Sequence, residues 1–281
     1  MGRGVVVAAL VLALLAALGA GAWWGWQRHE DERRVRQVVT QAARAEVKTL
    51  SLPGGAQMEM VYVAPGSFTM GSPVGQDDDQ TPHRVTLTKG YWLGKYEVTQ
   101  RQWRSVMGDN PSRFDGDDHP VGNVSWDDCQ KFIGKVSAAA RQQLGGEARL
   151  PTEAEWEYAC RAGTTGPYGG TGLLDDMGWY WSNNESERKT HPVGAKAPNA
   201  WGFYDMHGNV WEWCQDWYDA YPSGSATDPK GPASGGSRVL RGGGWVNDAR
   251  YCRSAYRYWY SPAYRKWCYG FRLCCSLSPR E

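Results

Sequence analysis

The chain has 281 residues and a net charge of +1, and 41% of its residues are hydrophobic. This length allows one large domain or two small ones. Because the charge is nearly balanced, the composition gives no electrostatic case for a nucleic-acid partner. The 35 glycines and 16 tryptophans are unusual, and they are typical of a loop-rich fold held together by aromatic side chains.

The N-terminus carries a separate apolar segment. Val5–Trp26 contains no charged residue and, at about 1.5 Å per residue, can cross a hydrocarbon core of about 30 Å. Residues 1–26 are therefore predicted to be a membrane anchor, and the alternative is a signal peptide cleaved near Ala20-Gly21-Ala22. We expect the domain that follows to be exported to the periplasm or the extracellular side. Arginines directly after the span leave the cytoplasmic side open.

Residues 27–51 are charged and helix-prone, and they predict a juxtamembrane helix or linker before a globular domain at 52–281. The segment Met58–Ser72 alternates in polarity around Pro65-Gly66, which predicts a β-hairpin. His83–Leu87 and Tyr91–Leu93 predict further short strands.

Three helices are predicted from their N-terminal signals. Thr99, Ser125 and Thr152 each precede a helical pattern, with a side chain three residues later that can bond back to the helix start. The predicted helices end near Gly108, Gln143 and Arg161. Beyond Gly163 only short strands are predicted, such as Val210–Cys214 and Arg238–Arg241. The fold class is therefore α+β, with few helices, short strands and long structured loops.

Residues 238–272 form the most informative segment. Its apolar positions follow neither the helical nor the strand period, and it is rich in tyrosine, arginine and tryptophan between GGGW and GFR. Aromatic rings offer a large, rigid contact area, as binding surfaces do. We therefore expect an aromatic-rich surface for an unknown protein or small-molecule ligand. The predicted ligand-binding residues are Trp245, Asn247, Asp248, Tyr251, Tyr256, Tyr258, Tyr260, Tyr264, Trp267 and Tyr269.

Six ordered blocks carry a family resemblance: MVYVAPGSFTMGS, GYWLGKYEVTQRQW, PVGNVSWDDCQKF, RLPTEAEWEYACRAGT, NAWGFYDMHGNVWEWCQDWY and RVLRGGGWVNDARYCRSAYR. Together with the final GFRL they resemble the sulfatase-modifying-factor, or formylglycine-generating-enzyme, family over about Met58–Leu273. The resemblance implies a single domain with a variant of the C-type lectin fold and bound calcium.

The resemblance also implies an activity that this sequence departs from. Formylglycine-generating enzymes are copper-dependent oxidases that convert a sulfatase cysteine to formylglycine, with two cysteines binding Cu(I). The second cysteine position falls on Cys252, but the first falls on Asn247. Cu(I) prefers thiolates, so an amide is a poor substitute and copper is not expected. Cys252 remains the candidate catalytic residue, with a disulfide or a buried thiol as the more ordinary roles.

Calcium is the expected cofactor. By resemblance, Asp205 and Glu212 provide carboxylates, while Gly208 and Val210 provide backbone carbonyls. Ca²⁺ prefers six to eight hard oxygen ligands, and a glycine-bent loop can direct carbonyls inward. The alternative is that the two carboxylates only cap turns. His207 in the same loop could face a ligand or be a hydrogen-bonded loop histidine.

The cysteines do not decide whether the domain lies in an oxidising or a reducing compartment. The seven cysteines form no CxxC pair, which argues against a zinc ribbon, and we expect two or three disulfides if the domain is exported.

Segment 238–272 further resembles the variable proteins of diversity-generating retroelements, in which a C-terminal segment is diversified at asparagine codons. Adenine changes alone turn such codons into those of tyrosine, serine, aspartate, valine or cysteine. The candidate positions are Val246, Asp248, Tyr251, Tyr256, Tyr258, Tyr260, Ser261, Tyr264, Cys268 and Tyr269.

Two functions follow from the sequence. One is a membrane-tethered, non-catalytic ligand-binding domain. The other is a formylglycine-generating-type oxidase, or another protein-modifying enzyme, that acts through Cys252 with a different partner thiol.

Overall fold

The computed structural model describes residues 30, 32–40, 42, 45–73 and 81–277. The predicted membrane anchor lies outside these residues. Among the residues described, no helix is both long and apolar enough to cross a bilayer. The chain divides into two compact units, Met1–Gln37 and Val38–Glu281. Residues 32–37 of the first are helical.

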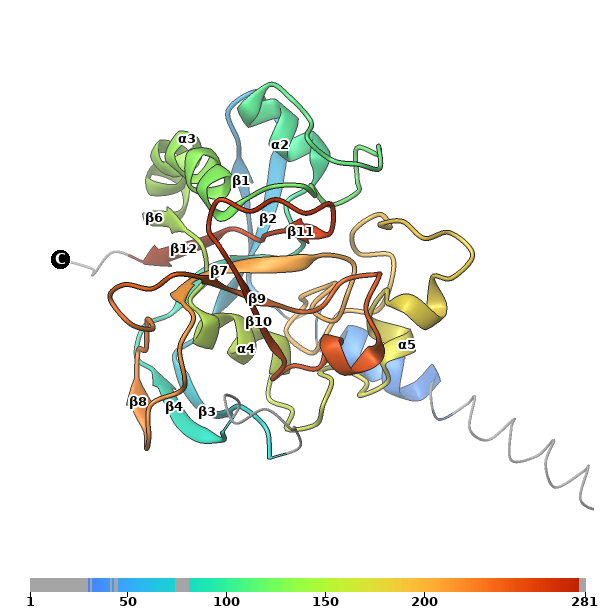
Figure 1. The fold of residues 1–281 in the computed structure, drawn as a ribbon, viewed down its shortest axis with the longest axis vertical. Helices are drawn as coiled ribbons and strands as arrows, with labels where there is room; N and C mark the ends of the chain where they lie inside the picture. Colours follow the sequence, from blue (N-terminus) through green and yellow to red (C-terminus); the bar gives the residue numbers. More distant parts are fainter. Residues whose placement is uncertain (1–29, 31, 41, 43–44, 74–80, 278–281) are drawn as a thin grey trace, which may run out of the picture. The chain divides into compact units, whose positions relative to one another are not determined.

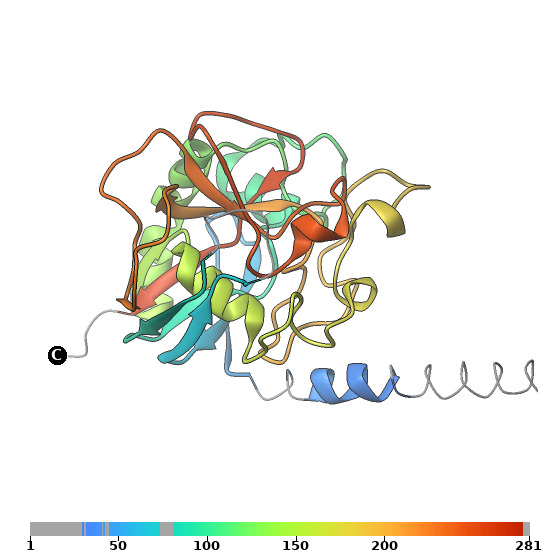
Figure 2. The same cartoon turned by 60° about the horizontal axis from the view of Figure 1, so that its bottom comes forward.

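Three β-sheets build the second unit (Figure 1 and Figure 2). Their strand orders are β1-β2-β5-β12-β6, β10-β9-β7-β11 and β3-β4-β8. The strands are β1 Val47–Ser51, β2 Gln57–Val63, β3 Gly66–Met70, β4 His83–Leu87, β5 Tyr91–Gly94, β6 Gly146–Arg149, β7 Trp211–Trp217, β8 Ala226–Thr227, β9 Arg238–Arg241, β10 Arg257–Tyr260, β11 Tyr269–Gly270 and β12 Cys274–Leu277.

The last strand closes the domain. β12 lies antiparallel between β5 and β6, so that Cys275 is opposite both Trp92 and Ala148. The last strand is thus built into the same sheet as the first strand, β1, and the order of strands in space differs from their order in sequence.

The three predicted helices are confirmed as α2 Gln100–Met107, α3 Trp126–Leu144 and α4 Glu153–Arg161, and a short α5 spans Leu174–Met177. Thr99, Ser125 and Thr152 each form a complete capping box. α2 and α3 end at Gly108 and Gly145 in the left-handed conformation, which glycine adopts without steric cost. The sequence located these helices because their signals are local.

Two sequence predictions are wrong. Met58–Ser72 is not a hairpin, because β2 pairs with β1 and β5 whereas β3 pairs with β4 in a different sheet. Pro65 marks a change of sheet rather than a tight turn. The predicted linker 27–51 also overlaps β1, whose Val47 lies opposite Val61, so the sheet begins before Leu52.

The core has two parts, which pack around α3 and around α4. In the first part Trp103 stacks on Phe132 with ring centroids 5.6 Å apart, and Phe271 meets Phe132 edge-on. In the second part Trp156 of α4 belongs to a buried cluster with residues from all three sheets. The expected disulfides are not formed: Cys129, Cys160, Cys214, Cys252, Cys268, Cys274 and Cys275 are buried free thiols.

Candidate ligand-binding site

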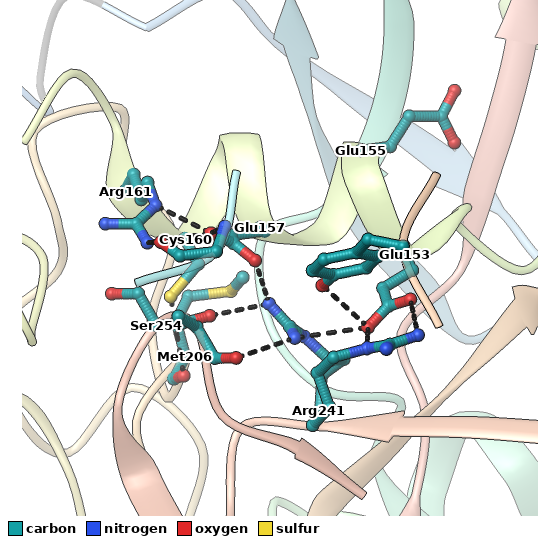
Figure 3. A network of polar contacts seen from close by, with 12 residues as sticks. Glu153, Glu155, Glu157, Cys160, Arg161, Met206, Arg241 and Ser254 are labelled. Atoms are coloured by element: carbon teal, nitrogen blue, oxygen red, sulfur yellow. Dashed lines mark hydrogen bonds and ion pairs between the residues drawn. The ribbon is translucent and has the colours of Figure 1, made fainter. Parts of the chain in front are cut away.

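Helix α4 holds the aromatic segment in place through a buried ionic network (Figure 3). Arg257 binds Glu153 through Nε and Nη2, at 2.6 and 2.8 Å, and Arg241 reaches both Glu153 and Glu157. Arg241 also donates to the backbone carbonyls of Ser254 at 2.7 Å and Ala255 at 3.2 Å. One guanidinium therefore joins α4 to the turn before β10.

Two further arginines fix the rest of the segment. Arg265 binds Asp128 at the start of α3 in a bidentate pair, at 2.5 and 2.8 Å. Arg272 binds both oxygens of Glu212 at 2.6 Å. Bidentate arginine–carboxylate pairs fix geometry as well as charge. The irregular parts of the segment, between its short strands, are thereby held in a rigid frame.

Asp216 lies at the edge of this network, where its Oδ2 accepts a hydrogen bond from the backbone N–H of Glu153 at 2.9 Å. Burial, followed by the nearby charge of Glu153, raises the pKa of Asp216 to about 8. The folded state therefore keeps a proton on this carboxyl that the unfolded chain releases at lower pH.

We predict that Asp216→Asn weakens the pH dependence of stability. Between the ordinary carboxyl pKa and about 8, the folded state binds more protons, so the wild-type unfolding free energy falls as pH rises. One full proton of difference gives a slope of about 1.4 kcal/mol per pH unit. Denaturant unfolding from pH 5 to pH 8 measures both slopes. Equal slopes in the two proteins would show that Asp216 ionises normally.

Asn247 occupies the position at which the family resemblance implies the first copper-binding cysteine, and it helps to hold the aromatic segment in place. Its Oδ1 accepts a hydrogen bond from the indole Nε1 of Trp211 at 2.9 Å. Its backbone N–H donates to Gly244, and its carbonyl accepts from Trp181, each at 2.9 Å. The amide side chain thus orients a buried tryptophan that lies beneath the tyrosines.

Cys252 is fully buried, and burial raises the pKa of its thiol well above the ordinary range, with a further contribution from Asp248. Reactive cysteines have the opposite property, a lowered pKa and some exposure. The Cys252 carbonyl accepts from Nδ1 of His207 at 2.8 Å, while Nε2 of His207 accepts from the backbone of Gly169 at 2.9 Å. His207 is therefore a hydrogen-bonded loop histidine, and burial lowers its pKa to about 4.

The predicted ligand-binding residues lie at different depths. Trp245 and Tyr269 are buried and support the others from below. Asn247, Tyr251, Tyr256, Tyr258, Tyr260 and Trp267 are half-buried, whereas Asp248 and Tyr264 are exposed. We use "aromatic face" for six of the accessible rings, Tyr251, Tyr256, Tyr258, Trp259, Tyr260 and Tyr264, and leave out Trp267, whose ring packs on buried Trp245.

The rings of the aromatic face contact one another. Tyr260 stacks on Tyr264 with centroids 3.9 Å apart, and Tyr251 meets Tyr256 edge-on at 4.9 Å. The ring centroid of Tyr258 lies 5.1 Å from that of buried Trp211. These contacts limit the freedom of the side chains before a ligand arrives, which lowers the entropy cost of binding.

Trp259 is an accessible ring that was not among the predicted ligand-binding residues. It is 49% exposed, more than Tyr264 at 39%, and it lies on β10 at the edge of the four-stranded sheet. Alternation along β10 could not have identified it, because Arg257, two residues earlier and on the same face of the strand, is buried by its ion pairs.

The candidate diversified positions divide in the same way. Asp248, Ser261 and Tyr264 are exposed, and Val246, Tyr251, Tyr256, Tyr258 and Tyr260 are half-buried. Cys268 and Tyr269 are buried in the core. Variation at these last two positions would disturb packing rather than change a surface.

The predicted calcium loop lies beside a third carboxylate, Glu97. Burial, with Asp205 and Glu212 nearby, raises the pKa of Glu97 well above its ordinary value, and Arg272 is the cation that faces all three carboxylates. Oδ1 of Asp205 is buried and has no hydrogen-bond partner among the described residues. An unpaired buried oxygen and surplus negative charge fit a divalent cation.

Other contacts in the loop restrict that role. Both oxygens of Glu212 are engaged by Arg272, and Trp156 donates to one of them at 2.7 Å. Within the described ranges, no three His, Cys, Asp or Glu side chains form a group that could hold a metal ion. A calcium ion would therefore depend on the carbonyls of Gly208 and Val210, and the site stays a prediction.

Comparisons with known proteins agree with the fold and the motifs. Residues 47–277 match the model of the family described as sulfatase-modifying factor enzyme 1-like domain. The chaperone protein LppX of Paenibacillus barcinonensis is 31% identical, with 76% of this chain and 89% of that protein covered. The formylglycine-generating enzyme of Mus musculus is 37% identical over 63% of this chain and 47% of the enzyme, so the match spans about half of that relative.

Two solved structures are similar over nearly their whole length. Treponema denticola variable protein 1 is 34% identical with a TM-score of 0.74, covering 83% of this chain and 99% of that one. PvdO from Pseudomonas aeruginosa is 27% identical with a TM-score of 0.70, covering 83% and 98%. The predicted resemblance is confirmed, and the chain belongs to the sulfatase-modifying-factor, or formylglycine-generating-enzyme-like, domain family.

Proposed function

We propose that this chain is a non-catalytic ligand-binding member of its family and that the aromatic face is its binding surface. The observation that carries the proposal is that Asn247 has a structural role at the position where the family resemblance implies a metal ligand. Where the resemblance implies a copper thiolate, an amide oxygen binds the indole of Trp211 and so supports the rings above it. The similarity to a variable protein supports the same function.

The alternative oxidase is tested directly by copper. We expect Cu(I) titration of the purified chain to give the same affinity for wild type and Cys252→Ser, because the buried, neutral thiol lacks a second sulfur at position 247. We also expect no aldehyde when the chain is incubated with a sulfatase-type cysteine peptide and copper. Two-coordinate Cu(I) that depends on Cys252, or aldehyde formation, would replace the binding function with the oxidase.

Trp259→Ala combined with Tyr264→Ala tests the aromatic face. Both rings are substantially exposed, so we expect the melting temperature to change by no more than a few degrees. Peptides selected from a displayed library on the wild-type chain should bind the double variant at least about tenfold more weakly, since exposed aromatics are frequent binding hot spots.

Leu173→Ala is the matched control, because Leu173 is 37% exposed and lies outside the aromatic face. Selected peptides should bind this variant as they bind wild type. Equal binding to the aromatic double variant would place the binding surface elsewhere.

Calcium is proposed as a structural ion of the 205–212 loop. Two observations support this ion: Oδ1 of Asp205 is buried without a hydrogen-bond partner among the described residues, and the buried carboxylate of Glu97 lies nearby. Added Ca²⁺, but not the same concentration of Mg²⁺, should raise the melting temperature by mass action. No rise at millimolar Ca²⁺ would remove the site.

Residues 1–26 are proposed to tether the domain to a membrane, with the domain exported. The support is the uncharged apolar length of Val5–Trp26. Alkaline carbonate extraction distinguishes an integral anchor, which stays with the membrane, from a cleaved signal peptide, which leaves the domain in the supernatant.

A further inference from the structure

A second potential site lies away from the aromatic face. A cavity of 570 Å³ is lined by residues of α3, β6, β7 and β12, by the start of α4, and by the end of β4 with the loops after β4 and β8. None of its lining residues belongs to segment 238–272. Its volume is within the range of about 300–1,000 Å³ that small-ligand sites occupy. β8 and β12 end on the same side of the molecule in both views (Figure 1 and Figure 2).

Two glutamines in the cavity wall have unsatisfied amide atoms. Nε2 of Gln130 and Oε1 of Gln215 are buried and lack a hydrogen-bond partner within the described part of the chain. One is a donor and the other is an acceptor. A buried amide atom without a partner costs folding free energy unless a ligand or water satisfies it. Because both side chains line the cavity, a ligand that offers an acceptor and a donor would satisfy these atoms once the two amides turn toward it.

Some charged residues of the cavity wall have hydrogen-bonded partners within the protein, and others have none. Arg149 and Glu155 form a bidentate pair at 2.6 and 2.7 Å, and Asp228 accepts from the backbone and hydroxyl of Thr88. Lys89 and Lys230 form no salt bridge or hydrogen bond with any residue that the structure describes, and both face the charge of Asp228 at longer range. The wall thus holds three cations and two carboxylates, and the cations that remain available are the two lysines.

We propose that this cavity binds the carboxy-terminal end of a peptide. A peptide group presents one C=O and one N–H, which are the acceptor and donor that Gln130 and Gln215 lack. The terminal carboxylate supplies the negative charge that Lys89 and Lys230 can meet. Leu87 and Leu277 in the same wall give apolar contact for a small side chain.

The test is calorimetric titration of the full-length chain with N-acetyl-Ala-Ala and with its carboxy-terminal amide. We expect the free acid to bind with a Kd below about 1 mM and the amide to bind at least about tenfold more weakly, because the amide lacks the charge. Lys89→Gln with Lys230→Gln should weaken binding of the acid by a similar factor and should leave binding of the amide unchanged.

Gln130→Leu and Gln215→Leu test the amide contacts separately. Each should weaken binding of both probes about tenfold while melting no lower than wild type, because the removed atoms have no partner in the free protein. The lysine variant alters only exposed side chains, so it stays informative if a glutamine variant is unstable. Gln142→Leu on α3 and Lys48→Gln on β1 are exposed controls outside the cavity, and they should bind like wild type.

Three results would overturn the proposal: no binding of the acid at 10-fold the expected Kd, equal binding of acid and amide, or wild-type affinity in the lysine and glutamine variants. The Trp259→Ala, Tyr264→Ala variant separates this site from the aromatic face, because it should bind N-acetyl-Ala-Ala normally. Loss of dipeptide binding in that variant would assign the peptide end to the aromatic face instead.

Discussion

Gly243→Val is expected to destabilise the domain strongly. Gly243 has a φ of +74°, and a Cβ at this position would lie 2.7 Å from Sγ of Cys252 and 3.0 Å from the carbonyl oxygen of Tyr251. The left-handed conformation costs an L-residue about 1–2 kcal/mol, and overpacking of a tight site adds about 1–3 kcal/mol. A valine also has two further methyl groups. We expect the unfolding free energy to fall by about 2–5 kcal/mol, which thermal or denaturant unfolding measures.

Gly236→Val is the control for this change. A Cβ at Gly236 would have no heavy atom within 4 Å, so valine there should be tolerated. Gly243→Ala should lie between the two, since it adds the clashing Cβ without the branches. If Gly243→Val melts with the wild type, the GGGW turn would not require glycine and the frame of the aromatic segment would be looser than the contacts show.

The helices could be predicted from sequence because each is specified within a few residues. Thr99, Ser125 and Thr152 all bond to the backbone three positions later, as their spacing indicates. Strand pairing could not be predicted in this way. β12 joins β5 and β6 across more than a hundred residues, and Pro65-Gly66 carries the same local signal for a hairpin and for a change of sheet.

The site could be located from sequence, but the depth of its residues could not. The aromatic composition of 238–272 identified the segment, whereas Trp245 and Trp259 look equivalent there and are 5% and 49% exposed. In a segment without a period, the direction of a side chain depends on distant anchors. Here those anchors are carboxylates on α3, α4 and β7. Glu97 was missed for the same reason, because it joins the predicted calcium loop only in the folded chain.

Arg241→Leu is expected to lower both stability and ligand binding. Oε2 of Glu157 accepts from Arg241 and has no other described partner, and the carbonyls of Ser254 and Ala255 depend on the same guanidinium. Leucine fills part of the space but leaves these buried acceptors unpaired. Removal of one member of a buried ion pair costs about 3–5 kcal/mol. Unfolding in denaturant measures the loss, and Arg141→Leu, in an exposed pair with Glu147, should unfold like wild type.

Arg241→Lys separates charge from geometry in the same network. Lysine keeps the positive charge but cannot reach Glu157 and two carbonyls with a planar fork, so we expect an intermediate loss of stability. The turn at Ser254 leads directly into β10, which carries three rings of the aromatic face. Both variants should therefore bind selected peptides more weakly than wild type even at temperatures where they are fully folded. Wild-type stability in Arg241→Lys would show that charge alone holds the segment. Wild-type stability in Arg241→Leu would show that the aromatic face is anchored by its other contacts, with Arg257 and Arg272 the first candidates.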